Sequence, residues 1–256
     1  MKIGVIGGSA FPADWNDWSG FERAPEYDVG ADSLTDSSQL GAASADLVGV
    51  TCGPSSLLFL ARHGVNHHLL PAEINYRANL KLLRDAGVEA VIATHTVGGI
   101  DPAIPVGGLA FPAQVIDYTW GRLDTYAGNG VVRHVEFDAP FHKGLSDQLH
   151  SIAVAHSVDV HCGGVYGCTQ GPRFESPAEV DRLERDGVTV VGMTAMPEAC
   201  LAAELGLPYA SISLVVNAAA GRGTIELEAI HQAGRDGMAQ IQLLLRELLQ
   251  QGELLL

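Results

Sequence analysis

Nearly continuous apolar runs, each ending in a glycine-rich or polar turn, recur along this chain. Two of them, "LLFLARHG" (57–64) and "VEAVIATHTVGGI" (88–100), flank "AEINYRANLKLLRDAG" (72–87), which has helical periodicity and is closed by Gly87. Strands that are apolar at almost every position are typical of sheets covered by helices on both faces. The order strand, helix, strand therefore predicts an α/β fold.

Helix and strand signals elsewhere extend this pattern. The clearest helix start is Ser176, whose side chain can cap the helix while Pro177 takes the first helical position and Glu179 completes a capping box; Gly187 ends it. Two further helices are expected, one beginning near Pro197 and an amphipathic one over 225–250. Further buried strands are expected over residues 3–6, just after Gly187, and up to Asn217.

Two segments have no readable topology. Residues 12–46 are rich in Asp, Ser, Gly and Ala without sustained periodicity, which predicts a long surface excursion or a mobile loop. Residues 108–170 alternate short apolar runs with turn residues. Since 256 residues with 47% hydrophobic content can bury one sizeable core, a single domain over residues 1–256 is expected.

Charge and composition argue against several classes of partner. A net charge of -15 opposes binding to nucleic acid or anionic lipid, which require clustered Lys and Arg. No apolar stretch approaches the roughly 20 residues that span a bilayer, and the opening run ends at Gly7 without the cleavage site of a secretory signal. The four cysteines have neither C-x-x-C spacing nor the density of a disulfide scaffold. We therefore expect a soluble, cytoplasmic protein with reduced thiols.

Polar residues gather where the predicted strands end. Because ligands in open α/β sheets bind outside the carboxyl ends of the strands, we expect these residues to converge on one site. Hydroxyls, backbone amides and one guanidinium are the groups that a phosphate needs. Taken singly, each residue also has an ordinary structural reading as a surface charge, a satisfied histidine or a turn residue. The residues are Ser9, Arg62 with His63, those from Thr94 to Gly99, and Met193 with Thr194.

Other chemistries have weaker support. The spacing of Gly4, Gly7 and Gly8 departs from the G-x-G-x-x-G motif of dinucleotide folds, and no G-x-S-x-G motif of serine hydrolases is present. "HGVNHH" places three histidines close together, but no H-E-x-x-H or paired C-x-x-C motif accompanies them, so no metal site is expected. Glu175, just ahead of a helix start, is either a carboxylate favoured by the helix dipole or an acceptor that recognises a base.

Seven segments together resemble the trimeric purine nucleoside phosphorylase and methylthioadenosine phosphorylase family, over essentially the whole chain. They are "GVIGGSA", "LARHG", "PAEINYRANL", "VGGI", "TQGPRFESPAE", "VVGMTAMPE" and "SISLVVNAAAG". The resemblance implies a single α/β domain with a mixed, partly barrel-like central sheet flanked by helices. It also implies a homotrimer with active sites near subunit interfaces.

The resemblance implies the reaction and the residues that carry it. Phosphate, a co-substrate, would attack C1′ of a purine nucleoside and release the free base and a ribose 1-phosphate derivative, with no metal or organic cofactor. Met193 would contact the ribose, Phe174 would pack near base and sugar, and Glu175 and Asn217 would read the purine edge. The residues expected to hold phosphate are Ser9, Arg62, His63, Thr194 and, through its backbone, Thr96. The catalytic residues would be Arg62, Glu175 and Asn217.

Departures from the family pattern point to a particular substrate. Ser9 stands where the methylthio members usually have Thr, which keeps the hydroxyl. His95 occupies a position that is usually Thr or Asn, and it would either add positive charge or turn inward. Residues 28–46 lack the usual "TPYG" connection. Leu227 stands where ordinary nucleoside phosphorylases place a His near the 5′-hydroxyl, which favours a methylthio group.

The residues expected to contact the purine edge indicate a 6-oxopurine base. The neutral amide of Asn217, where adenine-specific members have Asp, can donate to O6, and the carboxylate of Glu175 can accept from N1–H. The expected substrate is therefore 5′-methylthioinosine. The alternatives are a methylthioadenosine phosphorylase, a general inosine or guanosine phosphorylase, hydrolysis by water as in nucleosidases, and a noncatalytic purine-binding protein.

Overall fold

Strand β5 (Ala90–Gly99) is the centre of the fold. It pairs in parallel with β1 (Lys2–Gly7) along its first half and with β11 (Tyr209–Ala218) along its whole length. Where β1 stops, the antiparallel strand β10 (Val190–Gly192) pairs with the last residues of β5. Because β5 borders three strands, the sheet branches there, and its parallel and antiparallel pairs give the mixed sheet that was expected.

The remaining strands extend these three branches. β1 continues through β4 and β3 to β2, while β10 continues through β9 to β7. β11 carries β6, which in turn pairs with β8. The bounds of these strands are β2 (Glu22–Arg23), β3 (Val48–Cys52), β4 (Ser55–Ala61), β6 (Leu109–Phe111), β7 (Gln114–Asp117), β8 (Val160–Cys162) and β9 (Val165–Cys168).

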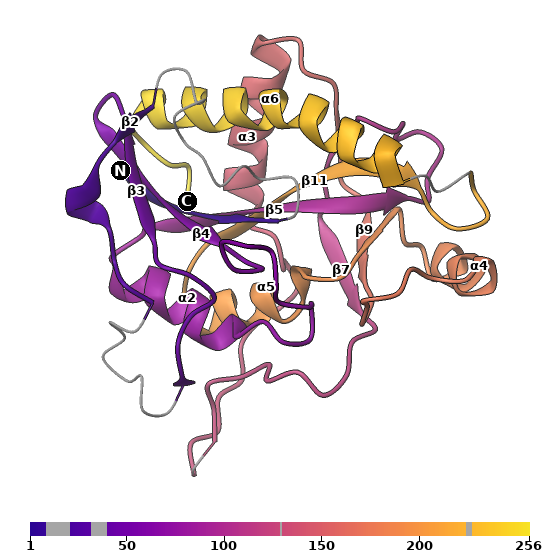
Figure 1. Ribbon diagram of the computed structural model, residues 1–256, viewed down its shortest axis with the longest axis horizontal. Helices are drawn as coiled ribbons and strands as arrows, with labels where there is room; N and C mark the ends of the chain where they lie inside the picture. Colours follow the sequence, from indigo (N-terminus) through magenta and orange to yellow (C-terminus); the bar gives the residue numbers. More distant parts are fainter. Residues whose placement is uncertain (9–20, 32–39, 129, 224–226) are drawn as a thin grey trace.

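Helices cover both faces of the sheet, as the apolar runs predicted (Figure 1). α3 (Lys143–Ala155) and α6 (Leu227–Gln251) lie on one face, and α2 (Tyr76–Asp85) and α5 (Ala195–Glu204) lie on the other. Successive residues of β5 alternate between the two cores: Val91 packs on the α2 and α5 side, and Ile92 on the α3 and α6 side. Neither face of the central strands is left to solvent.

The helix ends agree with the signals in the sequence, with small shifts. α4 (Pro177–Arg185) begins with the predicted capping box: the Ser176 hydroxyl accepts from the Glu179 amide, and the Glu179 carboxylate accepts from the Ser176 amide. α2 starts at Tyr76, where the Asn75 side chain caps it. α5 starts at Ala195, two residues before the expected Pro197, and Met196 departs from helical geometry.

The computed structural model describes residues 1–8, 21–31, 40–128, 130–223 and 227–256, without the side chain of Leu227. Much of the predicted surface excursion over 12–46 lies outside these residues; its described part includes β2 and the short 3-10 helix η2 (Pro25–Tyr27). Within 108–170, for which the sequence predicted no topology, the described residues contribute four short strands and α3. Among the described residues, no helix has the length and apolarity needed to cross a membrane.

Candidate active site

One cavity of about 400 Å³ collects the polar residues that follow the central strands. Gly8 follows β1, Arg62 and His63 follow β4, and Thr194 follows β10, while β5 and β11 contribute residues from their last halves. The predicted convergence of strand ends is therefore present. Of the expected site residues, those that line this cavity are Arg62, His63, His95, Thr96, Phe174, Glu175, Met193, Thr194 and Asn217.

Two expected site residues cannot be placed. Ser9 lies outside the described residues, but its neighbour Gly8 lines the cavity, and a Cβ on Gly8 would come within 3.0 Å of the Thr94 carbonyl oxygen and 3.1 Å of Arg62 Nη1. The absence of a side chain thus lets this turn approach β5 closely. The side chain of Leu227 is also not described; Ile230 and His231, one turn further along α6, line the cavity instead.

The guanidinium of Arg62 is fully buried and paired with Glu198 of α5. Nε donates to Glu198 Oε1 at 2.5 Å, Nη2 donates to Oε2 at 3.0 Å, and Nη1 donates to the carbonyl oxygen of Thr94 at 2.9 Å. This bidentate geometry fixes the plane of the guanidinium against the cavity wall. Since Glu198 is also fully buried, the pair brings a cation to the cavity without a net charge.

His63 is held as a neutral imidazole. Its Nδ1 lies 2.8 Å from the carbonyl oxygen of Leu69, which can only accept, so Nδ1 carries the proton. Burial lowers the pKa of His63 to about 4, and the nearby charge of Arg62 acts in the same direction. At neutral pH the cavity therefore gains no charge from this ring.

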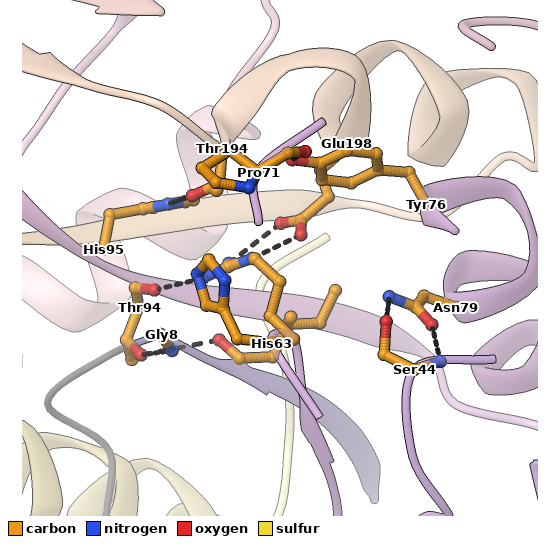
Figure 2. A network of polar contacts seen from close by, with 12 residues as sticks. Gly8, Ser44, His63, Pro71, Tyr76, Asn79, Thr94, His95, Thr194 and Glu198 are labelled. Carbon is orange, nitrogen blue, oxygen red and sulfur yellow. Dashed lines mark hydrogen bonds and ion pairs between the residues drawn. The ribbon is translucent and has the colours of Figure 1, made fainter. Parts of the chain in front are cut away.

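His95 turns inward, the second of the two alternatives that its position left open. Its Nδ1 lies 3.0 Å from Thr194 Oγ1 and its Nε2 lies 3.3 Å from the hydroxyl of Tyr209. Burial holds the pKa of His95 well below its usual range, and the charge of Arg62 adds to this effect. His95 is therefore a neutral member of a buried network rather than an added cation (Figure 2).

The same cavity is lined by the two polar side chains expected at the base, Glu175 and Asn217. Glu175 Oε1 accepts from the Thr169 hydroxyl at 2.6 Å, and Asn217 Nδ2 donates to the Ala218 carbonyl oxygen at 2.7 Å. Each contact orients the side chain and leaves the second carboxylate oxygen, or the amide oxygen and the second N–H, for a ligand. Phe174 is 47% exposed, so much of its ring lies at the surface.

Sequence reasoning missed Glu198, Tyr209 and Arg122. Tyr209 donates to Glu198 Oε2 at 2.9 Å and so completes the network behind Arg62. Arg122 donates to the carbonyl oxygens of Met193, Gln170 and Met196, which ties together the loops that carry Met193 and Glu175. One signal was available: Glu198 is a single carboxylate in the otherwise apolar "AMPEACLAA", and a buried carboxylate requires a buried cation.

Comparison with known proteins identifies the family. The family model described as "Phosphorylase superfamily" matches residues 54–250. A protein of Pseudomonas syringae named probable S-methyl-5′-thioinosine phosphorylase is 45% identical over 85% of this chain and 90% of its own length. A 6-oxopurine nucleoside phosphorylase of Pyrococcus furiosus is 42% identical over 86% of this chain and 80% of its own.

The fold agrees with this match. The structure of methylthioadenosine phosphorylase from Schistosoma mansoni, in complex with adenine, superposes with a TM-score of 0.85. That alignment covers 97% of this chain and 91% of the other at 26% identity. With its family match, its relatives and a cavity at the ends of the central strands, the chain belongs to the phosphorylase superfamily, among the nucleoside phosphorylases.

Proposed function

We propose that this chain cleaves 5′-methylthioinosine with phosphate, giving hypoxanthine and 5-methylthioribose 1-phosphate. One observation carries the proposal: a single cavity joins an anion end, with Arg62 and the Thr194 hydroxyl, to a base end with Glu175 and Asn217. The names of the relatives with 45–50% identity, probable S-methyl-5′-thioinosine phosphorylases, support the same choice of substrate.

The chemistry would rely on positioning and electrostatics. Breaking the bond between C1′ and N9 develops oxocarbenium character on the sugar and negative charge on the purine. Hydrogenphosphate forms the new bond to C1′ and gives up its proton, and the departing purine takes up one proton at N7, by way of solvent. Arg62 would hold the phosphate in place, while Asn217 would donate to O6 and accept from a protonated N7. Glu175 would accept from N1–H. Holding phosphate beneath C1′ makes the attack effectively intramolecular. No organic cofactor is required.

Phosphate dependence tests this assignment. With purified protein and methylthioinosine, we expect hypoxanthine release that requires phosphate, with one 5-methylthioribose 1-phosphate formed per base. Release that is equally fast without phosphate would indicate a nucleosidase. Tight binding of the nucleoside without turnover in either buffer would indicate a purine-binding protein instead.

The 5′ substituent gives a second test. The resemblance places Leu227 at the 5′ end of the sugar, and Ile230 of the same helix lines the cavity. An apolar contact there should make kcat/KM for methylthioinosine exceed that for inosine by about 10- to 200-fold, the range that packing alone supplies. Leu227→His should reduce this ratio. Equal specificity constants would contradict the assignment. A preference for inosine that disappears in His231→Leu would show that the polar residue of α6 reads the 5′ position.

We also propose that three copies associate, as the family resemblance implies. Large apolar side chains stand exposed on the loop after β7, with Trp120 at 73% and Leu123 at 64% exposure, close in sequence to Arg122, which supports the site loops. A surface of this kind is typical of contacts between copies. Light scattering should give a mass about three times that of the 26.9 kDa chain.

A further inference from the structure

We infer that His95 makes the Thr194 hydroxyl a hydrogen-bond acceptor toward the bound anion, so that the site selects tetrahedral oxyanions that carry a proton. Hydrogenphosphate would be accepted and sulfate refused. The inference rests on the proposed function, because it assumes that an oxyanion occupies the end of the cavity lined by Thr194. His95 acts here as a positioning residue, through Thr194.

The direction of the hydrogen bonds follows from the buried ion pair. Glu198 is fully buried against Arg62 and is therefore an ionised carboxylate with no proton to give. The single hydroxyl proton of Tyr209 must accordingly go to Glu198 Oε2, 2.9 Å away. The Tyr209 oxygen can then only accept from His95, so the proton of the imidazole resides on Nε2.

The other ring nitrogen then determines the orientation of Thr194. With its proton on Nε2, His95 presents a lone pair at Nδ1, and Thr194 Oγ1, 3.0 Å away, must donate its only proton there. Thr194 is the N-cap residue of α5, a position where a Thr hydroxyl ordinarily accepts from the helix, yet its side chain makes no capping bond. Its lone pairs remain for a ligand in the cavity.

Protonation of His95 would reverse this polarity, and the surroundings oppose it. His95 is 2% exposed, and this burial keeps its pKa low. The positive charge of Arg62 lowers the pKa of His95 further. His63, which also lines the cavity, is neutral as well, with its proton on Nδ1, and the ring of His67 lies 4.5 Å from it.

An acceptor at Thr194 discriminates by the proton on the anion. At neutral pH phosphate carries at least one P–OH group, which can donate to Thr194 Oγ1. Sulfate carries no proton and would face the same oxygen lone pair to lone pair. A buried polar mismatch of this kind corresponds to roughly 5- to 150-fold in affinity. Hydrogenarsenate has the same shape and proton as hydrogenphosphate and would be accepted.

The test measures phosphate and sulfate binding by calorimetry, without nucleoside. We expect the unmodified protein to bind sulfate at least about fivefold more weakly than phosphate. His95→Phe keeps an aromatic ring in the space but removes Nδ1, which frees the Thr194 hydroxyl to donate, so the two affinities should approach one another. Tyr209→Phe removes the acceptor for Nε2–H, so the proton of His95 is no longer fixed on Nε2. The ratio of phosphate affinity to sulfate affinity should therefore fall as it does in His95→Phe.

The ratio of phosphate affinity to sulfate affinity distinguishes the positioning role of His95 from a purely structural role. A change that only loosens the site would weaken both anions equally and leave the ratio unchanged. Equal affinities in the unmodified protein, or full discrimination in both variants, would overturn the inference. If one variant fails to fold, the other gives the same reading. Because binding is measured without turnover, discrimination in a protein that does not cleave nucleosides would count against the proposed function alone.

Discussion

Replacing Arg62 by Met is expected to lower both the stability of the protein and its use of phosphate. The guanidinium and its partner Glu198 are both 0% exposed, so the substitution leaves a carboxylate buried without its cation. Breaking a buried pair in this way costs about 3–5 kcal/mol of unfolding free energy. Denaturant unfolding measures this loss.

A double variant separates folding from chemistry. Adding Glu198→Gln to Arg62→Met removes the unpaired charge, and the Gln side-chain oxygen can still accept from Tyr209, so most of the stability should return. The use of phosphate should not return. Charge-assisted hydrogen bonds are worth about 1.5–3 kcal/mol, so kcat/KM for phosphate should stay roughly 10- to 150-fold below the unmodified value.

Arg23 supplies the matched control. It also forms a two-pronged pair, with Asp28, but both side chains are about 40% exposed, and neither residue lines the cavity. Arg23→Met should change stability by less than about 1 kcal/mol and leave phosphate use as it was. A double variant at Arg62 and Glu198 that regains normal phosphate use would show that Arg62 serves folding only.

The elements that the sequence could predict are those with a long apolar run or a clear capping motif. The strand that ends at Ala61 was readable because its last five residues, Leu57 to Ala61, are all apolar, and its end pointed to the site. β5 and β11 were readable for the same reason, and α4 was readable from its capping box. The strands β6 and β8 were not, because three residues each are too few to show a period.

The partner of Arg62 could not be read in the same way. Glu198 stands 136 residues further along the chain, and only the packing of α5 against the sheet brings the two groups together. Likewise, Tyr209 appeared as part of an apolar strand, although its hydroxyl orients His95. Periodicity predicts which face a residue takes, whereas hydrogen-bond direction depends on the neighbours that the whole fold supplies.

The base end gives the other large expected effect, a change of substrate. We expect the unmodified protein to prefer methylthioinosine to methylthioadenosine by a factor of order 10³ or more, since two mismatched polar contacts of about 1–3 kcal/mol each would oppose adenine. Adenine N1 carries no proton and would face the carboxylate of Glu175. This carboxylate is held in place by the Thr169 hydroxyl, which donates to Glu175 Oε1 at 2.6 Å. Its 6-amino group would face an N–H of Asn217.

Converting both contacts should reverse this preference. Asn217→Asp provides an acceptor for the 6-amino group, and Glu175→Ser removes the carboxylate and supplies a hydroxyl that can donate to N1. The variant should gain kcat/KM for methylthioadenosine and lose it for methylthioinosine. Neither side chain takes part in the Arg62 network, so the KM for phosphate should change little.

Thr169→Val provides the internal control for this reversal. It removes the hydroxyl that orients Glu175 but leaves the carboxylate, so the preference for the 6-oxopurine should weaken without reversing. If the unmodified protein already cleaves methylthioadenosine faster than methylthioinosine, the reading of the base edge is wrong. Phosphate-dependent cleavage would still stand in that case, because it depends on Arg62 and Thr194 rather than on the two residues that read the base.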